Sequence, residues 1–383
     1  GAALTGLPAA NLTGALPALD GSALTNLPGV TKSANDPLVT TNPSGGLGEL
    51  FLNTTSGEMF ACTDATTDAN VWTNLGAGTG DVIPYNWGGT SYGYVYGGEP
   101  TSGARVGMVS TFSLVTDGDS TQPANLVQSV TRSNYTGNSS LTHGYCIGGS
   151  SGSASDVIDK FAFANESGGM SDVGNLSSAK EYVTSAGNEY NAWITIATAI
   201  NKLNYVSGGN ANLQTANLFS SANSYASSSS STHGYSMGGW AGGPHSNSIE
   251  KYIFATDTDS GDVGDLSMAP AMNNGLSSST HGYSCGGYPV GGPTAFDGQD
   301  KISFSTDVIT LNIGTLSDGK YSCGAVSSTA YGYLAGGHPA SSTTNGTVSK
   351  IQKIDFANDG NATSVGDLTR SPLTDKMGQG SQV

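Results

Sequence analysis

The chain has 383 residues, of which 56 are glycine and only 11% are charged, and its formal net charge is -16. Glycine at about twice its usual share of roughly 7% excludes a mostly helical fold, because each glycine inside a helix costs about 1 kcal/mol relative to alanine. The negative charge argues against nucleic acid as a partner. No apolar run reaches the ~20 residues that a membrane helix needs, so we expect no membrane insertion.

Residues 1–30 form a low-complexity segment with three Leu-Thr-x-(x)-Leu-Pro units, which begin at Leu4, Leu12 and Leu24. The regularly placed prolines exclude a continuous helix. A segment this short cannot build a core that buries its own leucines. We therefore predict that identical chains associate here into a fibrous, oligomerising stalk; the alternative is a flexible linker.

Residues 31–80 predict a small β meander followed by a linker. Short apolar runs at 49–53, 58–63 and 71–75 are typical of strands, and Thr55-Ser56-Gly57 predicts a turn between the first two. Residues 76–80 are the glycine-rich linker.

Residues 81–383 repeat one unit, whose first motif is Gly-Tyr-x-x-Gly-Gly. A second motif with an aromatic strand follows, as in Ile249-Glu250-Lys251-Tyr252-Ile253-Phe254, and a third resembles Val263-Gly264-Asp265-Leu266. One copy is degenerate and has Ala192 where the first glycine belongs. The six unit starts are 93, 144, 192, 234, 282 and 332.

A period of 40–50 residues holding four short strands predicts a β-propeller, because each blade buries its faces only against its neighbours. The fold class is therefore all-β, with six blades. The repeat resembles the kelch family, although leucines at 176, 218, 266, 316 and 368 stand near the place of the kelch tryptophan. Either a strand near Val82–Tyr85 closes the ring, or the chain continues beyond Val383.

The front of the chain is similar to segments of tailed-bacteriophage fibres. The similarity rests on the Leu-Thr-Gly-Leu-Pro repeats and on residues 48–60 and 71–75. It implies a homotrimeric stalk that presents a C-terminal receptor-binding head, an extracellular location on the virion tail, and contacts with other virion proteins. The Ser/Asn/Gly-rich repeats also resemble those of virion proteins from marine cyanobacterial phages.

Several repeated residues have both a functional and a structural interpretation. His143, His233 and His281 precede the Gly-Tyr pair, and we interpret His-Gly as a hairpin turn with glycine at positive φ rather than as a metal site. Asp257–Asp262 lacks the full spacing of a calcium loop and predicts a polar turn.

The four cysteines form no CxxC pair, so we interpret them as buried strand residues. The lysines that recur in the second motif are expected to pair with acids of a neighbouring unit or to cover aromatic rings: Lys160, Lys202, Lys251, Lys301 and Lys353.

The loops after each Gly-Gly pair differ most among the copies, and they are the candidate binding surface. Exposed aromatic side chains on such loops suit stacking on sugars or contact with a protein, and the alternative is that they pack over the blade rim. The receptor-binding candidates are Glu99, Trp240, Pro244, His245, Tyr288, Pro289, His338 and Pro339.

The sequence contains no nucleophile elbow, zinc-protease motif or phosphate loop, so we expect a non-enzymatic protein with no cofactor, metal or catalytic residue. The leading hypothesis is a phage tail fibre or related virion appendage whose head binds a host surface glycan or protein. One alternative is a virion protein that docks neighbouring subunits during assembly. Another is a secreted, carbohydrate-active propeller enzyme, which would need convergent carboxylates or a metal in a central pocket.

Overall fold

The computed structural model describes residues 30–75, 89–100, 105–123, 131–165, 168–219, 223, 225–240, 244–256, 258–289, 295–339, 349–369, 373–374 and 378–381. The chain divides into two units, Gly1–Pro84 and Tyr85–Val383. The described residues form β-strands and contain no α-helix, so the all-β prediction is confirmed. None of the described segments is a helix long and apolar enough to cross a membrane.

The first unit is a four-stranded sheet of β1 (Val30–Ser33), β2 (Leu50–Asn53), β3 (Met59–Asp64) and β4 (Val71–Asn74), in that order. Its three antiparallel strands occupy the predicted ranges, while the parallel strand β1 was not predicted. Phe51, Phe60, Cys62 and Trp72 form its core. Residues 1–29, and with them the predicted stalk, lie outside the described residues.

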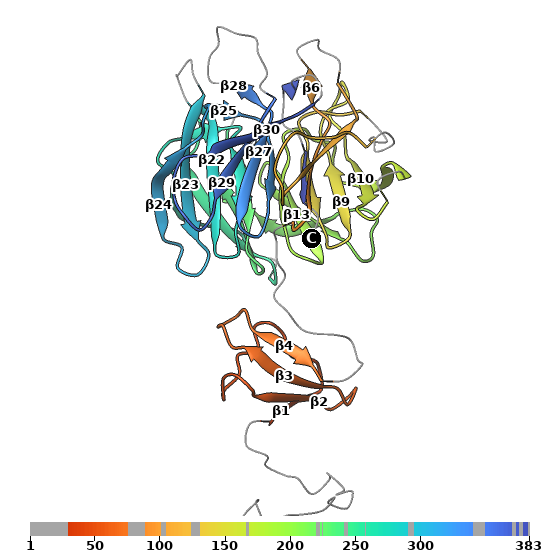
Figure 1. Cartoon of the computed structure of the whole chain (residues 1–383). Coiled ribbons are helices and arrows are strands. Elements are labelled where there is room, and N and C mark those ends of the chain that lie inside the picture. Colours follow the sequence, from red (N-terminus) through yellow and green to blue (C-terminus); the bar gives the residue numbers. More distant parts are fainter. Residues whose placement is uncertain are drawn as a thin grey trace, which may run out of the picture. The chain divides into compact units, whose positions relative to one another are not determined.

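The described part of the second unit contains six sheets that repeat one antiparallel pattern (Figure 1). In the second to sixth sheets, the serine- or alanine-containing strand comes first, the Gly-Tyr strand second, the lysine strand third and a more exposed strand last. The first sheet contains β5 (Tyr92–Tyr96) and β7 (Val109–Ser113), and the second contains β8 (Thr136–Ser139), β9 (His143–Ile147), β10 (Val157–Ala162) and β11 (Ser171–Asn175). The third contains β12 (Thr184–Gly187), β13 (Asn191–Ile196), β14 (Ala199–Asn204) and β15 (Asn212–Asn217), and the fourth contains β16 (Ala226–Ser229), β17 (His233–Met237), β18 (Ser248–Ile253) and β19 (Gly261–Asp265). The fifth contains β21 (Asn274–Ser277), β22 (His281–Pro289), β23 (Phe296–Ser303) and β24 (Ile309–Thr315), and the sixth contains β26 (Gly324–Ser327), β27 (Tyr331–Ala335), β29 (Lys350–Asp355) and β30 (Thr363–Asp367).

The first sheet receives a strand from the far end of the chain. β32 (Gly378–Ser381) pairs antiparallel with β5, so that Gly378 lies opposite Tyr96 and Ser381 opposite Gly93. Residues 82–85, which were expected to close the ring if the chain did not continue, lie outside the described residues. The first strands contact one another in the succession β8, β12, β16, β21, β26, β32 and back to β8.

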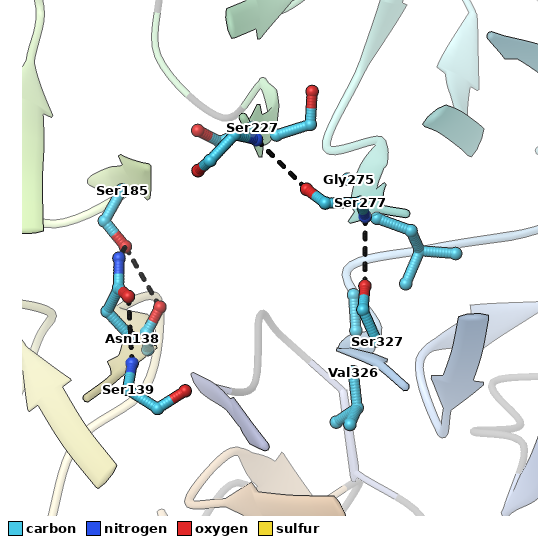
Figure 2. Close-up of a pocket in the computed structure, with 13 residues that line it drawn as sticks. Asn138, Ser139, Ser185, Ser227, Gly275, Ser277, Val326 and Ser327 are labelled. Atoms are coloured by element: carbon cyan, nitrogen blue, oxygen red, sulfur yellow. Dashed lines mark hydrogen bonds between the residues drawn. The ribbon is translucent and has the colours of Figure 1, made fainter. Parts of the chain in front are cut away.

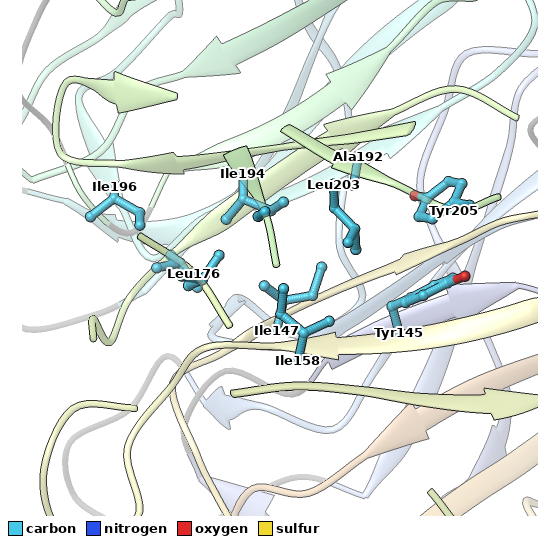
Figure 3. Close-up of a cluster of buried hydrophobic side chains, with 11 residues drawn as sticks. Tyr145, Ile147, Ile158, Leu176, Ala192, Ile194, Ile196, Leu203 and Tyr205 are labelled. Carbon is cyan, nitrogen blue, oxygen red and sulfur yellow. The ribbon is translucent and has the colours of Figure 1, made fainter. Parts of the chain in front are cut away.

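Hydrophobic cores lie between successive sheets. Between the second and third sheets, Ile147 and Ile158 face Ile194 and Leu203, and Leu176 packs beside them (Figure 3). Each such side chain contributes about 1.5–3 kcal/mol when buried. Equivalent clusters join the first sheet to the second, the third to the fourth, the fourth to the fifth, the fifth to the sixth, and the sixth to the first.

The expected role of the His-Gly pair as the hairpin turn is wrong. The turn residues between β8 and β9 are 141–142, and the Ser140 N–H donates to the His143 carbonyl at 2.9 Å. Gly144 does not have a positive φ; it is required because a Cβ there would lie 2.4 Å from the Phe161 ring. Positive φ occurs instead at the following pair, Gly148 (68°) and Gly149 (98°).

The four cysteines are free and buried, as predicted; Cys62, Cys146 and Cys285 lie in strands, whereas Cys323 comes just before β26. Burial raises the pKa of the Cys146 thiol to about 12, so this group remains protonated at neutral pH. Leu176, Leu218, Leu266, Leu316 and Leu368 are also buried, with exposed fractions of 3–5%.

Candidate functional site

The Gly-Gly turn sets up the same short pairing in five repeat units. The residue that follows each Gly-Gly pair forms an antiparallel pairing with a residue just before the first strand of the same unit. In the fifth unit β22 extends to pair with β20 (Pro270–Ala271), and in the sixth β28 (His338–Pro339) pairs with β25 (Lys320–Tyr321). The residues at this repeat position are Glu99, Ser150, Trp240, Tyr288 and His338.

Aromatic rings from three successive units meet on these loops. The ring centroids of His245 and Tyr288 are 6.3 Å apart, those of Tyr288 and Tyr321 are 5.6 Å apart, and those of Tyr321 and His338 are 4.8 Å apart. The last two rings are nearly parallel, with an interplanar angle of 5°. We refer to His245, Tyr288, Tyr321 and His338 as the aromatic row.

Part of this surface is open to solvent. Tyr288 is 40% exposed, and Trp240, which lies opposite His245 across an antiparallel bridge, is 42% exposed. Tyrosine and tryptophan combine a large apolar face with a polar edge, and both are enriched at binding surfaces. The row can therefore stack against a ligand and also hydrogen-bond to it.

Neither His338 nor Lys320 presents a positive charge to the row. Burial lowers the pKa of His338 below its usual value, so this imidazole is neutral at pH 7. Behind Tyr321, the buried Lys320 ammonium donates to the carbonyl oxygens of Leu334 and Lys350, each at 3.1 Å. Burial also lowers the pKa of Lys320, and its donors are directed into the fold rather than toward the row.

The structure brings together four of the candidates named from sequence, namely Trp240, His245, Tyr288 and His338. Pro244 is exposed beside His245, and Pro289 and Pro339 pair with Pro270 and Lys320. Glu99 lies in β6 (Glu99–Pro100), which pairs with β31 (Leu373–Thr374).

Tyr321 was missed because only the loops after Gly-Gly were considered. It precedes the first strand of its unit, and its place in the row depends on the pairing of β25 with β28. The short Lys320-Tyr321 segment carries no alternating pattern that would have marked it as a strand.

A second candidate is the cavity between the first strands (Figure 2). Serine hydroxyls dominate its lining, and Asn138 donates to Ser185 at 3.2 Å while the Ser277 N–H donates to Ser327 at 3.0 Å. Its volume is about 70 Å³, well below the ~300 Å³ of typical ligand pockets. No carboxylate, histidine or cysteine is among its described lining residues, so the lining offers hydrogen bonds and no general acid or base.

The repeated histidines do not converge. Each Nδ1 of His143, His233 and His281 shares a 2.8 Å hydrogen bond with the preceding threonine hydroxyl. In the described part of the chain, no three histidine, cysteine, aspartate or glutamate side chains gather as metal ligands would. Asp259 accepts a hydrogen bond from the Asn217 N–H of the neighbouring unit, and Asp262, which lies within β19 (Gly261–Asp265) rather than in a turn, accepts one from the Gly264 N–H.

Three of the five repeated lysines, Lys251, Lys301 and Lys353, pair with acids of a neighbouring unit, as predicted. Lys251 binds Asp307 of the next unit at 2.8 Å, and Lys301 binds Asp359 at 2.7 Å. In the third unit, Lys202 lies 5.1 Å from the centroid of the Trp193 ring.

Comparison with known proteins adds no assignment, because no family model and no curated protein matches this chain.

Proposed function

We propose that the second unit is a six-bladed, kelch-like β-propeller. The proposal is supported by the closed succession of first strands, by the cores between successive sheets, and by the addition of β32 to the first sheet. In this arrangement the six sheets hide their faces against one another. All Gly-Gly turns then lie at one end of the propeller and all His/Tyr hairpins at the other.

This propeller serves, in our proposal, as a non-enzymatic head that binds a neutral glycan on a host surface through the aromatic row. The observation that carries the proposal is the contact of Tyr288 with both His245 and Tyr321, on loops that vary over a constant turn. A fixed scaffold with variable loops is the usual arrangement of recognition surfaces. Aromatic faces suit the apolar faces of sugar rings.

The virion assignment rests on the N-terminal resemblance to tailed-phage fibres. In this proposal residues 1–30 join three chains into a stalk, and the protein is an extracellular tail appendage attached to other virion proteins. Light scattering tests the stalk: the full chain, 38.6 kDa as a monomer, should have three times that mass. A truncation that begins at Asp81 should be monomeric, and a monomeric full chain would contradict the stalk.

The binding proposal is tested with the full chain on an array of neutral and acidic glycans. Tyr288→Ala should weaken binding of a neutral glycan at least tenfold, which corresponds to about 1.4 kcal/mol. Tyr190→Ala is the matched control. Tyr190 is 55% exposed and lies in the hairpin turn just before β13. The turn that corresponds to Gly-Gly in this unit follows the other end of β13, so Tyr190 is remote from the Gly-Gly end of that strand. Equal loss in both variants, or no glycan bound by the wild type, would refute the proposal.

The assembly alternative uses the same surface, since exposed aromatic rings also suit contact with a protein. Chemical labelling of Tyr288 in intact particles distinguishes the two functions. A labelled tyrosine favours receptor binding, and a protected one favours docking of a neighbouring subunit.

A further inference from the structure

The third-strand lysines occupy one repeat position. In each sheet the lysine lies opposite an aromatic residue of the second strand: Lys160 opposite Tyr145, Lys202 opposite Trp193, Lys251 opposite Tyr235, Lys301 opposite Tyr283, and Lys353 opposite Tyr333. Where the described structure shows an ion pair at this position, the acid comes from the next unit and sits in the turn after its third strand.

In the observed pairs the lysine contacts both oxygens of the carboxylate. In the fourth unit the Lys251 ammonium donates to both oxygens of Asp307, at 2.9 and 2.8 Å, and the Tyr235 hydroxyl donates to the same carboxylate at 3.2 Å. Lys301 contacts both oxygens of Asp359 at 2.7 Å. The position therefore holds a carboxylate by charge and by hydrogen bonds together.

The second unit has the lysine but not the acid. The residue that should supply the carboxylate to Lys160 is Gly208 of the third unit. Gly208 has a φ of 62°, close to the 56° of Asp307, and its N–H donates to the carbonyl four residues earlier at 3.0 Å, as that of Asp307 does at 2.9 Å. The turn is thus the same, and only the carboxylate is missing.

The space for that carboxylate is open. A Cβ added at Gly208 would meet no atom within 4 Å. Lys160 also borders a separate hollow of about 200 Å³, whose described lining residues, among them His143, Asn165 and Ser171, all belong to the second unit. In a chain with only 13 lysines and arginines, a half-buried lysine facing open space is an available cation.

We propose that Lys160 binds the carboxylate of a ligand from solution, in the place that an aspartate side chain takes in the fourth and fifth units. The ligand class is a small carboxylate, either a free acid or the carboxylate of an acidic sugar. This site is independent of the aromatic row: it lies toward the hairpin end of the strands and selects a charged group, whereas the row selects a neutral one.

Ligand-observed NMR with the full chain tests the proposal, using acetate, glucuronate and glucose as probes. Acetate or glucuronate should bind saturably, with a Kd in about the millimolar range, and glucose should not. Binding of glucuronate alone identifies an acidic sugar as the source, and binding of both identifies the carboxylate as sufficient. No saturable binding of either acid, or equal binding of glucose, would overturn the proposal.

Two variants locate the site, and one serves as a control. Lys160→Ala should abolish binding, and Gly208→Asp should weaken it at least about tenfold because the internal carboxylate occupies the place. Lys251→Ala, which removes a lysine already paired with Asp307, should leave binding unchanged. If Gly208→Asp does not fold, the binding measured with Lys160→Ala alone decides whether the proposal holds. Unchanged binding in either folded variant of the site would overturn the assignment.

Discussion

The Lys353 ammonium lies 2.9 Å from the nearer carboxylate oxygen of Asp117, although 236 residues separate the two in sequence. The Tyr333 hydroxyl donates to the same carboxylate at 3.2 Å. Lys353 belongs to the sixth sheet and Asp117 follows the first, so this pair joins the two ends of the repeat. It has the same geometry as the pairs between adjacent units.

The partly exposed pair of Lys353 and Asp117 should contribute less to stability than the fully buried pair of Arg132 and Asp159. Lys353 and Asp117 side chains are 18% and 27% exposed, so Asp117→Asn should cost no more than about 1 kcal/mol. Both side chains of the other pair are fully buried at a 2.6 Å separation, and Asp159→Asn leaves a buried charge, which should cost about 3–5 kcal/mol. Urea unfolding measures both, and equal costs would contradict the burial argument.

Removal of the C-terminal strand should open the second unit. A chain that ends at Thr369 lacks β32, so β5 loses its neighbour and the first strands on both sides lose a contact. We expect a lower melting temperature and increased binding of a hydrophobic dye. A chain shortened only by residues 382–383 is the control and should melt like the full chain. Identical melting of both truncations would show that β32 does not close the unit.

Gly144→Ala should destabilise the second unit because its methyl group would overlap the Phe161 ring. Overpacking of this kind costs about 1–3 kcal/mol. Ala192 occupies the equivalent position in the third sheet, opposite Leu203 in place of the aromatic ring. Ala192→Gly should therefore cost only about 1 kcal/mol, measured in the same denaturation experiment. A larger cost for Ala192→Gly than for Gly144→Ala would contradict this explanation.

Stability should fall as the pH falls from 7 to 5. Burial lowers the pKa values of His143, His233, His281 and His338 below the usual value of about 6.5. Below that pH the unfolded chain binds protons that the folded chain does not, so protonation favours unfolding. Unperturbed carboxyl groups of model peptides titrate near pH 4, below this window. Melting curves should show the loss, and replacing all four histidines with asparagine should reduce it; a rise in stability toward pH 5 would contradict the argument.

The repeat was predictable from the sequence because each unit carries the same glycines and strand motifs. Even the degenerate copy was placed correctly, since Ala192 pairs with Leu203 as Gly144 pairs with Phe161. The role of Gly144 was not predictable, because it depends on a ring that approaches from the neighbouring strand. A glycine's sequence position does not distinguish a tight contact from a turn.

The aromatic row was predictable only in part. The variable residues after Gly-Gly pointed to Trp240, Tyr288 and His338, whereas Tyr321 reaches the row through the pairing of β25 with β28. The contact of His245 with Tyr288 joins loops of two different units. Such contacts depend on how the units are placed beside each other, which the residues of one unit do not encode.

The most direct test of the binding proposal is a crystal structure of the full chain with a neutral glycan identified on the array. We predict a sugar ring stacked on Tyr288 or Trp240, with its hydroxyl groups within hydrogen-bond distance of the row. A glycan bound only at the serine-lined cavity or at the hairpin end would contradict the account.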